Sequence, residues 1–250
     1  MYVSALVAYD GTDYAGFQVQ DGVATIQGEL ERALSALKVV EGRVIGAGRT
    51  DAGVHASGQA IAAEVAWRHD CDDLERAWNA YLPPSIQVRR VKEVSRAFHP
   101  RFSAVSRTYR YTVMVQGPDG RALSTARRSP LTDRFALSEP GPLDVEAMGA
   151  AAQCLIGEQD YATFGRPPQG ENTVRRVLRA DWQRVVSDLE PLTDQISRQL
   201  VFTIQANAFL QRMVRAVVGT LLEVGRGRRT PADVAQALAD KDRQRASPPA

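Results

Sequence analysis

The sequence predicts an α+β protein made of two related domains. Its 250 residues are enough for one large domain or two small ones, and a hydrophobic fraction of 44% with a charged fraction of 24% is ordinary for a globular protein. In the first half, short apolar runs and helical patterns follow the order strand, helix, strand, strand, helix, strand. The second half repeats this order with variations. Such an order is typical of ferredoxin-like (RRM-like) domains, in which helices cover one face of a sheet.

Local signals define the elements of the first half. Thr25 is a good N-cap residue before a run that places apolar side chains on one helical face. Pro83 and Pro84 end a second helix, because proline cannot continue the helical hydrogen-bond ladder. The predicted elements are a strand at 2–9, a helix at 26–37, strands at 43–47 and 59–66, a helix at 74–81 and a strand at 86–91.

A connector at 94–106 separates the two halves, and the expected domains are 1–104 and 105–250. In the second half, an apolar helix is expected to start at Asn207, and Thr230 followed by Pro231 predicts the start of a last helix. The other predicted elements are a strand at 107–115, a long exposed loop at 117–142, a helix near 143–156, and strands near 173–186 and 198–206.

Composition favours a protein of the cytoplasm. No apolar run approaches the roughly 20 residues that cross a bilayer, so a transmembrane helix is not expected. The first residues lack the basic region of a signal peptide, so a signal peptide is not expected either. Cys71 and Cys154 lack the spacing of a disulfide framework, which favours a reducing compartment. The three histidines are equally scattered, so a zinc site is not expected.

Charge is unevenly distributed along the chain, although the net charge is only +2. Residues 1–40 hold five acids and two bases, whereas residues 89–134 hold eleven bases and three acids. Ten of these eleven bases are arginine, the side chain best suited to phosphate groups and base stacking. The block therefore predicts a surface that binds a polyanion, with an ordinary solvated face as the alternative.

One glycine-rich stretch, from Gly46 to Gln59, lies between two predicted strands and holds the strongest candidate for a reactive group. Asp51 lies at its centre, with Arg49 two residues before it and His55 four residues after it. A carboxylate on such a turn can be presented at the rim of a sheet, although a plain turn with Asp51 as a local backbone acceptor is the simpler alternative. A dinucleotide fingerprint is excluded, because its third glycine would fall at Asp51.

A second candidate, Arg215, occurs in a strongly apolar stretch that is predicted to be helical. Arg212 and Arg215 can simply face water on such a helix. The alternative is that Arg215 reaches into a cleft and pairs with a carboxylate, because an unpaired buried cation is costly. Asp51 is the expected partner.

Several motifs together resemble the tRNA pseudouridine synthases of the TruA type. The match covers most of the chain, in order. Two departures are Ser85, where the family usually has Asp, and the end of the sequence at Ala250, where the family continues into a short final strand. The resembling blocks are Tyr9-Asp10-Gly11 with Tyr14, Gly16 and Gln18; Gly48 to Ala56; Asn79 to Pro83; Phe98 to Ala104 with Arg107, Tyr109 and Tyr111; and Asn207-Ala208-Phe209 with Met213-Val214-Arg215 and Val218-Gly219.

The resemblance implies an enzyme that converts uridine to pseudouridine at nucleotides 38, 39 or 40 of the tRNA anticodon arm, without a metal or redox cofactor. It implies that Asp51 is the catalytic carboxylate and that Arg215, Tyr109 and Arg49 bind the substrate, while His55 braces the loop. It also implies a homodimer, and two ferredoxin-like domains joined into one mainly antiparallel sheet with a central cleft. The alternatives are a non-catalytic RNA-binding module on the same scaffold and an enzyme acting on a small phosphate compound.

Overall fold

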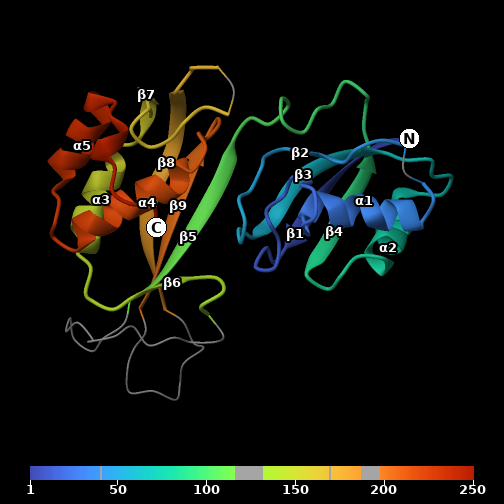
Figure 1. Cartoon of the computed structure of the whole chain (residues 1–250), viewed down its shortest axis with the longest axis horizontal. Coiled ribbons are helices and arrows are strands. Elements are labelled where there is room, and N and C mark those ends of the chain that lie inside the picture. The colour runs from blue at the N-terminus through green and yellow to red at the C-terminus, as the bar shows by residue number, and fades with distance from the viewer. Residues whose placement is uncertain (40, 116–131, 169, 187–197) are drawn as a thin grey trace, which may run out of the picture. The chain divides into compact units, whose positions relative to one another are not determined.

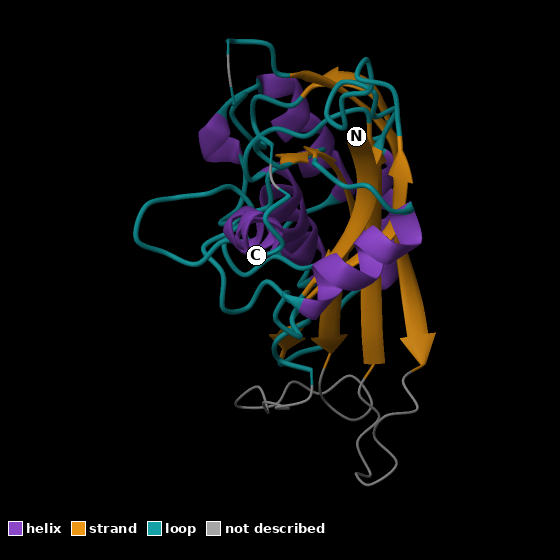
Figure 2. Ribbon diagram, turned by 90° about the vertical axis from the view of Figure 1, so that its right-hand side faces the viewer, coloured by secondary structure: helices purple, strands orange, loops and turns teal. Residues whose placement is uncertain are grey.

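The computed structural model describes residues 1–39, 41–115, 132–168, 170–186 and 198–250. Within these residues the chain is an α+β protein with nine strands and five α-helices (Figure 1 and Figure 2). It divides into two compact units, Met1–Ala104 and Val105–Ala250. No helix of the described residues is long and apolar enough to cross a membrane.

The first unit is a four-stranded antiparallel sheet with two helices. The strand order is β2-β3-β1-β4, and every pair in it is antiparallel. The predicted order of elements is confirmed, as are their approximate positions. Along the chain the elements are β1 (Tyr2–Tyr9), α1 (Ile26–Ala36), β2 (Ile45–Gly46), β3 (Ala56–Glu64), α2 (Cys71–Ala80) and β4 (Ile86–Glu93).

The core of the first unit forms where alternate side chains of the sheet pack against both helices. The predicted N-cap is confirmed, because the Thr25 side chain accepts a hydrogen bond from the backbone of Gly28. Leu30 and Trp78 are fully buried, and the Trp78 indole Nε1 donates to the Leu30 carbonyl oxygen at 3.1 Å. This bond joins α1 to α2, so the helices share one core with the sheet.

Strand β4 lies at the edge of this sheet, and a side chain of α2 covers its outer side. The Asn79 amide accepts from the Val88 N–H at 2.8 Å and donates to the Val88 carbonyl oxygen at 2.7 Å. An uncovered strand edge can pair with other chains. Asn79 therefore replaces a missing neighbouring strand at this position.

The second unit holds a five-stranded sheet in the order β6-β5-β9-β8-β7, antiparallel except for the β5–β6 pair. Helices α3, α4 and α5 share one hydrophobic cluster with strands β5, β8 and β9. Along the chain the elements are β5 (Arg107–Val115), β6 (Leu137–Glu139), α3 (Val145–Gln153), β7 (Gly157–Asp160), β8 (Val174–Val186), β9 (Arg198–Ala206), α4 (Met213–Gly225), α5 (Pro231–Asp240) and a short 3-10 helix (Arg243–Arg245).

A capping box and one partly buried ion pair hold helices of this unit in place. The expected start of the last helix is confirmed, because Thr230 and Asp233 form a reciprocal capping box at α5. The Glu139 carboxylate is only 4% exposed and pairs with Arg226, the C-cap of α4. The hydrogen bond to Glu139 raises the pKa of the Arg226 guanidinium. This pair ties β6 to the end of α4.

The helix expected to start at Asn207 begins later, at Met213. The Asn207 side chain instead accepts hydrogen bonds from the backbone N–H groups of Arg176, on β8, and Ala208. Arg212 then takes a left-handed conformation with φ of 61°, which a helix cannot include. Apolar spacing suggested a longer helix, because Leu210 is buried although it precedes the helix.

Two further expectations differ in detail. Strand β3 begins at Ala56 rather than 59, so the Asp51 loop is shorter than predicted. The predicted loop at 117–142 contains a short strand, β6, which pairs in parallel with β5. The part of that loop from 117 to 131 lies outside the described residues.

Candidate active site

Asp51 lies on the loop between β2 and β3, and its side chain is exposed. The Val54 N–H donates to the Asp51 carbonyl oxygen at 3.2 Å, which closes a tight turn around the carboxylate. Gly53 has φ of +75°, a conformation that suits glycine. The Gln59 side chain, from β3, donates to the Gly48 carbonyl oxygen at 3.2 Å. The turn is therefore held by its own backbone and by the strand that follows it.

A second loop, residues 10–18 after β1, supports the Asp51 turn from its other side. The Phe17 N–H donates to the Thr50 carbonyl oxygen at 3.0 Å, and the Gly53 N–H donates to the Tyr14 carbonyl oxygen at 3.3 Å. The hydroxyl of Tyr9, at the end of β1, lies 2.8 Å from Thr50 Oγ1. These bonds fix the residues on both sides of Asp51 and leave its carboxylate exposed.

Two glycines allow the loops to approach this closely. A Cβ on Gly11 would lie 2.0 Å from the Val54 carbonyl oxygen. Gly16 has φ of +99°, and a Cβ there would lie 2.7 Å from the Thr50 carbonyl oxygen. Sequence reasoning did not predict this contact. The signal for it was the spacing of glycines in a polar, aromatic loop that follows a strand.

His55 connects the same two loops. Its Nδ1 lies 3.1 Å from the Gly11 backbone nitrogen and 3.0 Å from Asp10 Oδ1. One ring nitrogen can accept from the N–H or donate to the carboxylate, but not both at once. Either arrangement ties the end of the Asp51 loop to the first loop. This geometry agrees with the expected bracing role of His55.

Ser85, one of the two departures from the family pattern, has a structural role here. Its hydroxyl lies 2.8 Å from the Tyr14 hydroxyl, and its carbonyl oxygen accepts from the Asp10 N–H at 2.9 Å. Both bonds attach the first loop to the start of β4. Ser85 therefore belongs to the framework beneath the Asp51 turn.

Arg49 lies on the Asp51 loop, two residues before the carboxylate, and is exposed. Among the described residues its guanidinium makes no hydrogen bond or ion pair. A cation held this way, on a fixed backbone but with unused donors, is available to a substrate.

Tyr109 and Arg215 belong to the second unit. Tyr109, on β5, is half-buried and packs edge-on against Phe209, with ring centroids 4.9 Å apart. Tyr111 lies two residues further along the same strand and also packs on the core. Burial raises the pKa of Tyr111, and the nearby positive charge of Arg215 acts in the opposite direction. Arg215, on α4, is exposed, and its Nε donates to the Ala250 carbonyl oxygen at 2.7 Å.

The expected site residues are thus divided between the two units. Arg49 and Asp51 share one loop of the first unit. In the second unit, Arg215 on α4 lies near Tyr111, and Tyr111 is on the same strand as Tyr109. The pairing of Asp51 with Arg215 stays a prediction.

The arginine-rich block at 89–134 is also divided between the units, and some of its members have structural partners. Arg96 pairs with Glu64, and the Arg107 guanidinium donates to the Asn207 carbonyl oxygen at 2.9 Å. Arg110 is exposed on β5. Three other members, Arg121, Arg127 and Arg128, lie outside the described residues.

Comparison with known proteins adds an independent line of evidence. A family model described as tRNA pseudouridine synthase matches residues 5–103 and 151–250. A tRNA pseudouridine synthase A of Chloroflexus aurantiacus is 42% identical over 249 residues, which cover 99% of this chain and 84% of the relative. Proteins of the same name from Brevibacillus brevis and Geobacillus kaustophilus are 39% and 38% identical, covering 96% and 99% of this chain and 91% and 89% of the relatives.

These matches extend over both units and include the Asp51 loop. They define the protein as an RNA-modifying enzyme of the isomerase class. The chain belongs to the tRNA pseudouridine synthase family, and its reaction is the isomerisation of uridine to pseudouridine in tRNA.

Proposed function

We propose that the enzyme acts on uridine at one or more of positions 38, 39 and 40 of the tRNA anticodon arm, with Asp51 as its catalytic carboxylate. The position in the tRNA rests on the resemblance, and the observation that carries the role of Asp51 is the way its turn is supported. Backbone hydrogen bonds hold Thr50 and Gly53, while the Asp51 side chain itself remains exposed. A group that must meet a reacting atom needs such a fixed backbone and a free side chain.

The reaction requires one carboxylate and leaves the atomic composition of the nucleotide unchanged. The bond between N1 of uracil and the anomeric carbon of the ribose breaks, and a bond from C5 of uracil to the same carbon forms. C5 then loses its proton, and N1 ends with one. An ionised Asp51 serves this chemistry either by attacking the anomeric carbon or by taking a proton from the sugar. The base must first leave the stack, at a cost of roughly a few kcal/mol.

Three further residues are proposed to act on the same uridine. Arg215 orients the Asp51 carboxylate, because a guanidinium forms directed hydrogen bonds with a carboxylate. Tyr109 offers a flat face that stacks on uracil and a hydroxyl that reaches a polar edge. Arg49 engages the RNA backbone or the space that the flipped base leaves. Each of these roles rests on the family's pattern and on the side chain's own chemistry.

The finer architecture belongs to the same proposal. The strand order β2-β3-β1-β4, with two helices in one core, supports a ferredoxin-like first domain. The domain of residues 1–104 carries the catalytic loop, and the domain of residues 105–250 completes the site. Its strand order, β6-β5-β9-β8-β7, differs from that of the first domain. The enzyme works in the cytoplasm as a homodimer, as the resemblance implies.

The direct test is the release of tritium from tRNA labelled at C5 of uracil. We expect release by the wild type and none by Asp51→Asn, which keeps the shape of the side chain but removes its charge. Binding of tRNA to the variant is expected to stay within a few-fold of wild type, because Asp51 contributes no attraction to phosphates. Equal release by the two proteins would remove Asp51 from the mechanism.

The position in tRNA is tested with substrates that carry label at one uridine each. Release is expected from at least one of positions 38, 39 and 40 and not from a labelled uridine in another arm. A wild type that binds tRNA but releases no label from any position would favour the non-catalytic RNA-binding alternative. Release only from other arms would contradict the anticodon-arm assignment and leave the role of Asp51 standing.

A further inference from the structure

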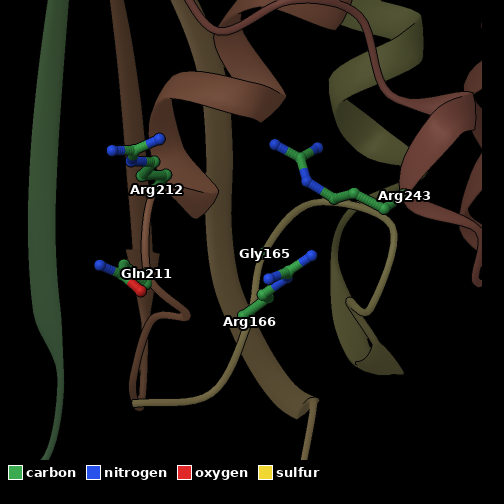
Figure 3. A pocket seen from close by; sticks show the side chains of 5 residues that line it. All are labelled: Gly165, Arg166, Gln211, Arg212 and Arg243. Carbon is green, nitrogen blue, oxygen red and sulfur yellow. The ribbon is translucent and has the colours of Figure 1, made fainter.

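A basic pocket lies wholly within the second unit (Figure 3) and has a volume of about 410 Å³. It shares no residue with the set expected to act on uridine. Among the described residues, three of the five that line it are arginines and none is acidic; the five are Gly165, Arg166, Gln211, Arg212 and Arg243.

The walls of this pocket are built from fixed backbone. The Gln211 N–H donates to the Arg166 carbonyl oxygen at 2.9 Å, and the two residues form an isolated β-bridge. Gly165 allows this approach, because a Cβ there would lie 2.6 Å from Leu210 Cβ and 2.8 Å from the Gln211 carbonyl oxygen. Arg166 and Arg212 therefore extend from two segments that are locked together, whereas Arg243 comes from the short 3-10 helix.

The start of α4 adds to the positive character of this region. Arg212 is the N-cap of the 13-residue helix, in a left-handed conformation, and no side chain caps the helix there. The first turn of a helix carries partial positive charge on its N–H groups. An anion near Arg212 would meet this partial charge as well as the guanidinium.

The three arginines keep their charge unneutralised among the described residues. None of them forms an ion pair there, whereas Arg179, Arg226 and Arg228 of the same unit each pair with a carboxylate. The Arg243 guanidinium donates to the Thr163 carbonyl oxygen at 3.0 Å, which anchors it through one nitrogen. In Figure 3 the side chains of Arg166 and Arg243 point into the same space from opposite sides.

The acidic residues near Arg243 in the sequence have other partners. Asp242, the residue before it, is the N-cap of the short 3-10 helix and accepts from the Gln244 N–H at 2.9 Å. Asp160 pairs with Lys241 at 3.2 Å, and Asp240 pairs with Arg245 at 3.0 Å. Three like charges around one pocket repel each other unless an anion lies between them. Within the part of the chain that the structure describes, no carboxylate forms an ion pair with any of these three guanidinium groups.

We propose that this pocket binds a phosphate group of the RNA backbone, as a contact with tRNA that is additional to the residues acting on uridine. Arginine suits this ligand, because its planar fork matches the oxygens of a phosphate. The volume leaves room for an attached sugar, so the phosphate need not be free. The proposal rests on tRNA as the substrate but not on the role of Asp51.

The test compares how tRNA affinity depends on salt in the wild type and in the double variant Arg166→Gln/Arg212→Gln. Arg243 is left intact, because its bond to Thr163 serves the fold. The matched control is Arg68→Gln/Arg184→Gln, which removes two exposed arginines without ion pairs among the described residues. The logarithm of the association constant for tRNA falls linearly with the logarithm of the salt concentration, and loss of one phosphate contact makes this slope less steep by about 0.9.

If binding is equal at 1 M salt, this slope makes the pocket variant bind tRNA about 15-fold more weakly at 50 mM salt and about 5-fold more weakly at 150 mM. The control is expected to keep the wild-type slope. Equal slopes for the pocket variant and the control would overturn the proposal. If inorganic phosphate stabilises the wild type but not the pocket variant, and the tRNA slopes are equal, the pocket binds a free phosphate and the RNA assignment fails.

This outcome is separable from the outcome for Asp51. If the wild type has a steeper salt dependence of tRNA binding than the pocket variant but forms no pseudouridine at positions 38–40, the pocket is supported and the proposed function is contradicted. Full pseudouridine formation at these positions, together with equal salt slopes for the pocket variant and the control, would support the proposed function and contradict the pocket.

Discussion

The contact between the first loop and the Asp51 turn gives the sharpest prediction, through Gly11. In Gly11→Ala the added Cβ would lie 2.0 Å from the Val54 carbonyl oxygen and 2.7 Å from its carbonyl carbon. Both obstacles are backbone atoms, so no side chain can rotate away to relieve the clash. Because real Cβ contacts are essentially never shorter than 3.0 Å, the two loops must separate by about 1 Å.

A displacement of this size falls on the segment that carries Asp51. A misplacement of about 1 Å at a reacting group can cost about 100-fold in rate, or about 2.7 kcal/mol of transition-state stabilisation. Overpacking typically costs about 1–3 kcal/mol in stability, which is less than the roughly 5–15 kcal/mol that holds a domain folded. We therefore expect Gly11→Ala to fold and to be a slow enzyme.

The assay is single-turnover pseudouridine formation with saturating tRNA, together with urea unfolding and tRNA binding. The matched control is Gly42→Ala, in the same unit, where an added Cβ meets nothing within 4 Å. We expect the rate of Gly11→Ala to fall about 100-fold while Gly42→Ala keeps the wild-type rate. A folded Gly11→Ala with a rate within two-fold of the control would refute the reasoning that the first loop positions Asp51.

Two further predictions concern stability. Asn79→Ala removes the amide that pairs with both backbone groups of Val88, and unsatisfied groups of this kind cost about 1–3 kcal/mol; a loss below about 0.5 kcal/mol in urea unfolding would contradict this role. The hydrogen bond from the Thr173 hydroxyl holds the pKa of Asp160 below 3.8, although burial acts in the opposite direction. The ionised Asp160 therefore stabilises the fold above pH 3.8, and this contribution is lost as the pH falls through the pKa of the folded state. Thr173→Val should therefore destabilise the protein more at pH 7 than near pH 3 and raise the midpoint of the Asp160 titration followed by NMR, and an unchanged midpoint would contradict it.

Much of the fold could be predicted because single residues carry strong local signals. Thr25 and Thr230 cap the helices whose starts they predicted, because a threonine oxygen just before a helix accepts a hydrogen bond from a free N–H of its first turn. The start of α4 could not be predicted in the same way. Leu210 is apolar because it is buried beside the helix, and periodicity does not distinguish that position from one inside the helix.

The candidate site was predictable to a different degree. Asp51 could be singled out because a carboxylate on a glycine-rich turn matches a family pattern, but its supporting loop could not. The contact of Gly11 with Val54 joins residues that are distant in sequence, and only the sheet brings them together. The arginine pocket was missed for the same reason, since Arg166 and Arg243 come from different segments.

Strand register explains why the two loops meet where they do. Val7 lies opposite Gln59, and Tyr9 lies opposite Ala56, so β3 uses one residue more than β1 between these pairs. This irregularity lies directly beside the loop that carries Asp51, where bulges commonly redirect a chain. Because Tyr9 and Ala56 end their pairing together, the loop that leaves β1 and the loop that enters β3 emerge side by side. The position of the carboxylate is thus set by the sheet through its register, and a change in that register would displace Asp51 without altering any residue of its loop.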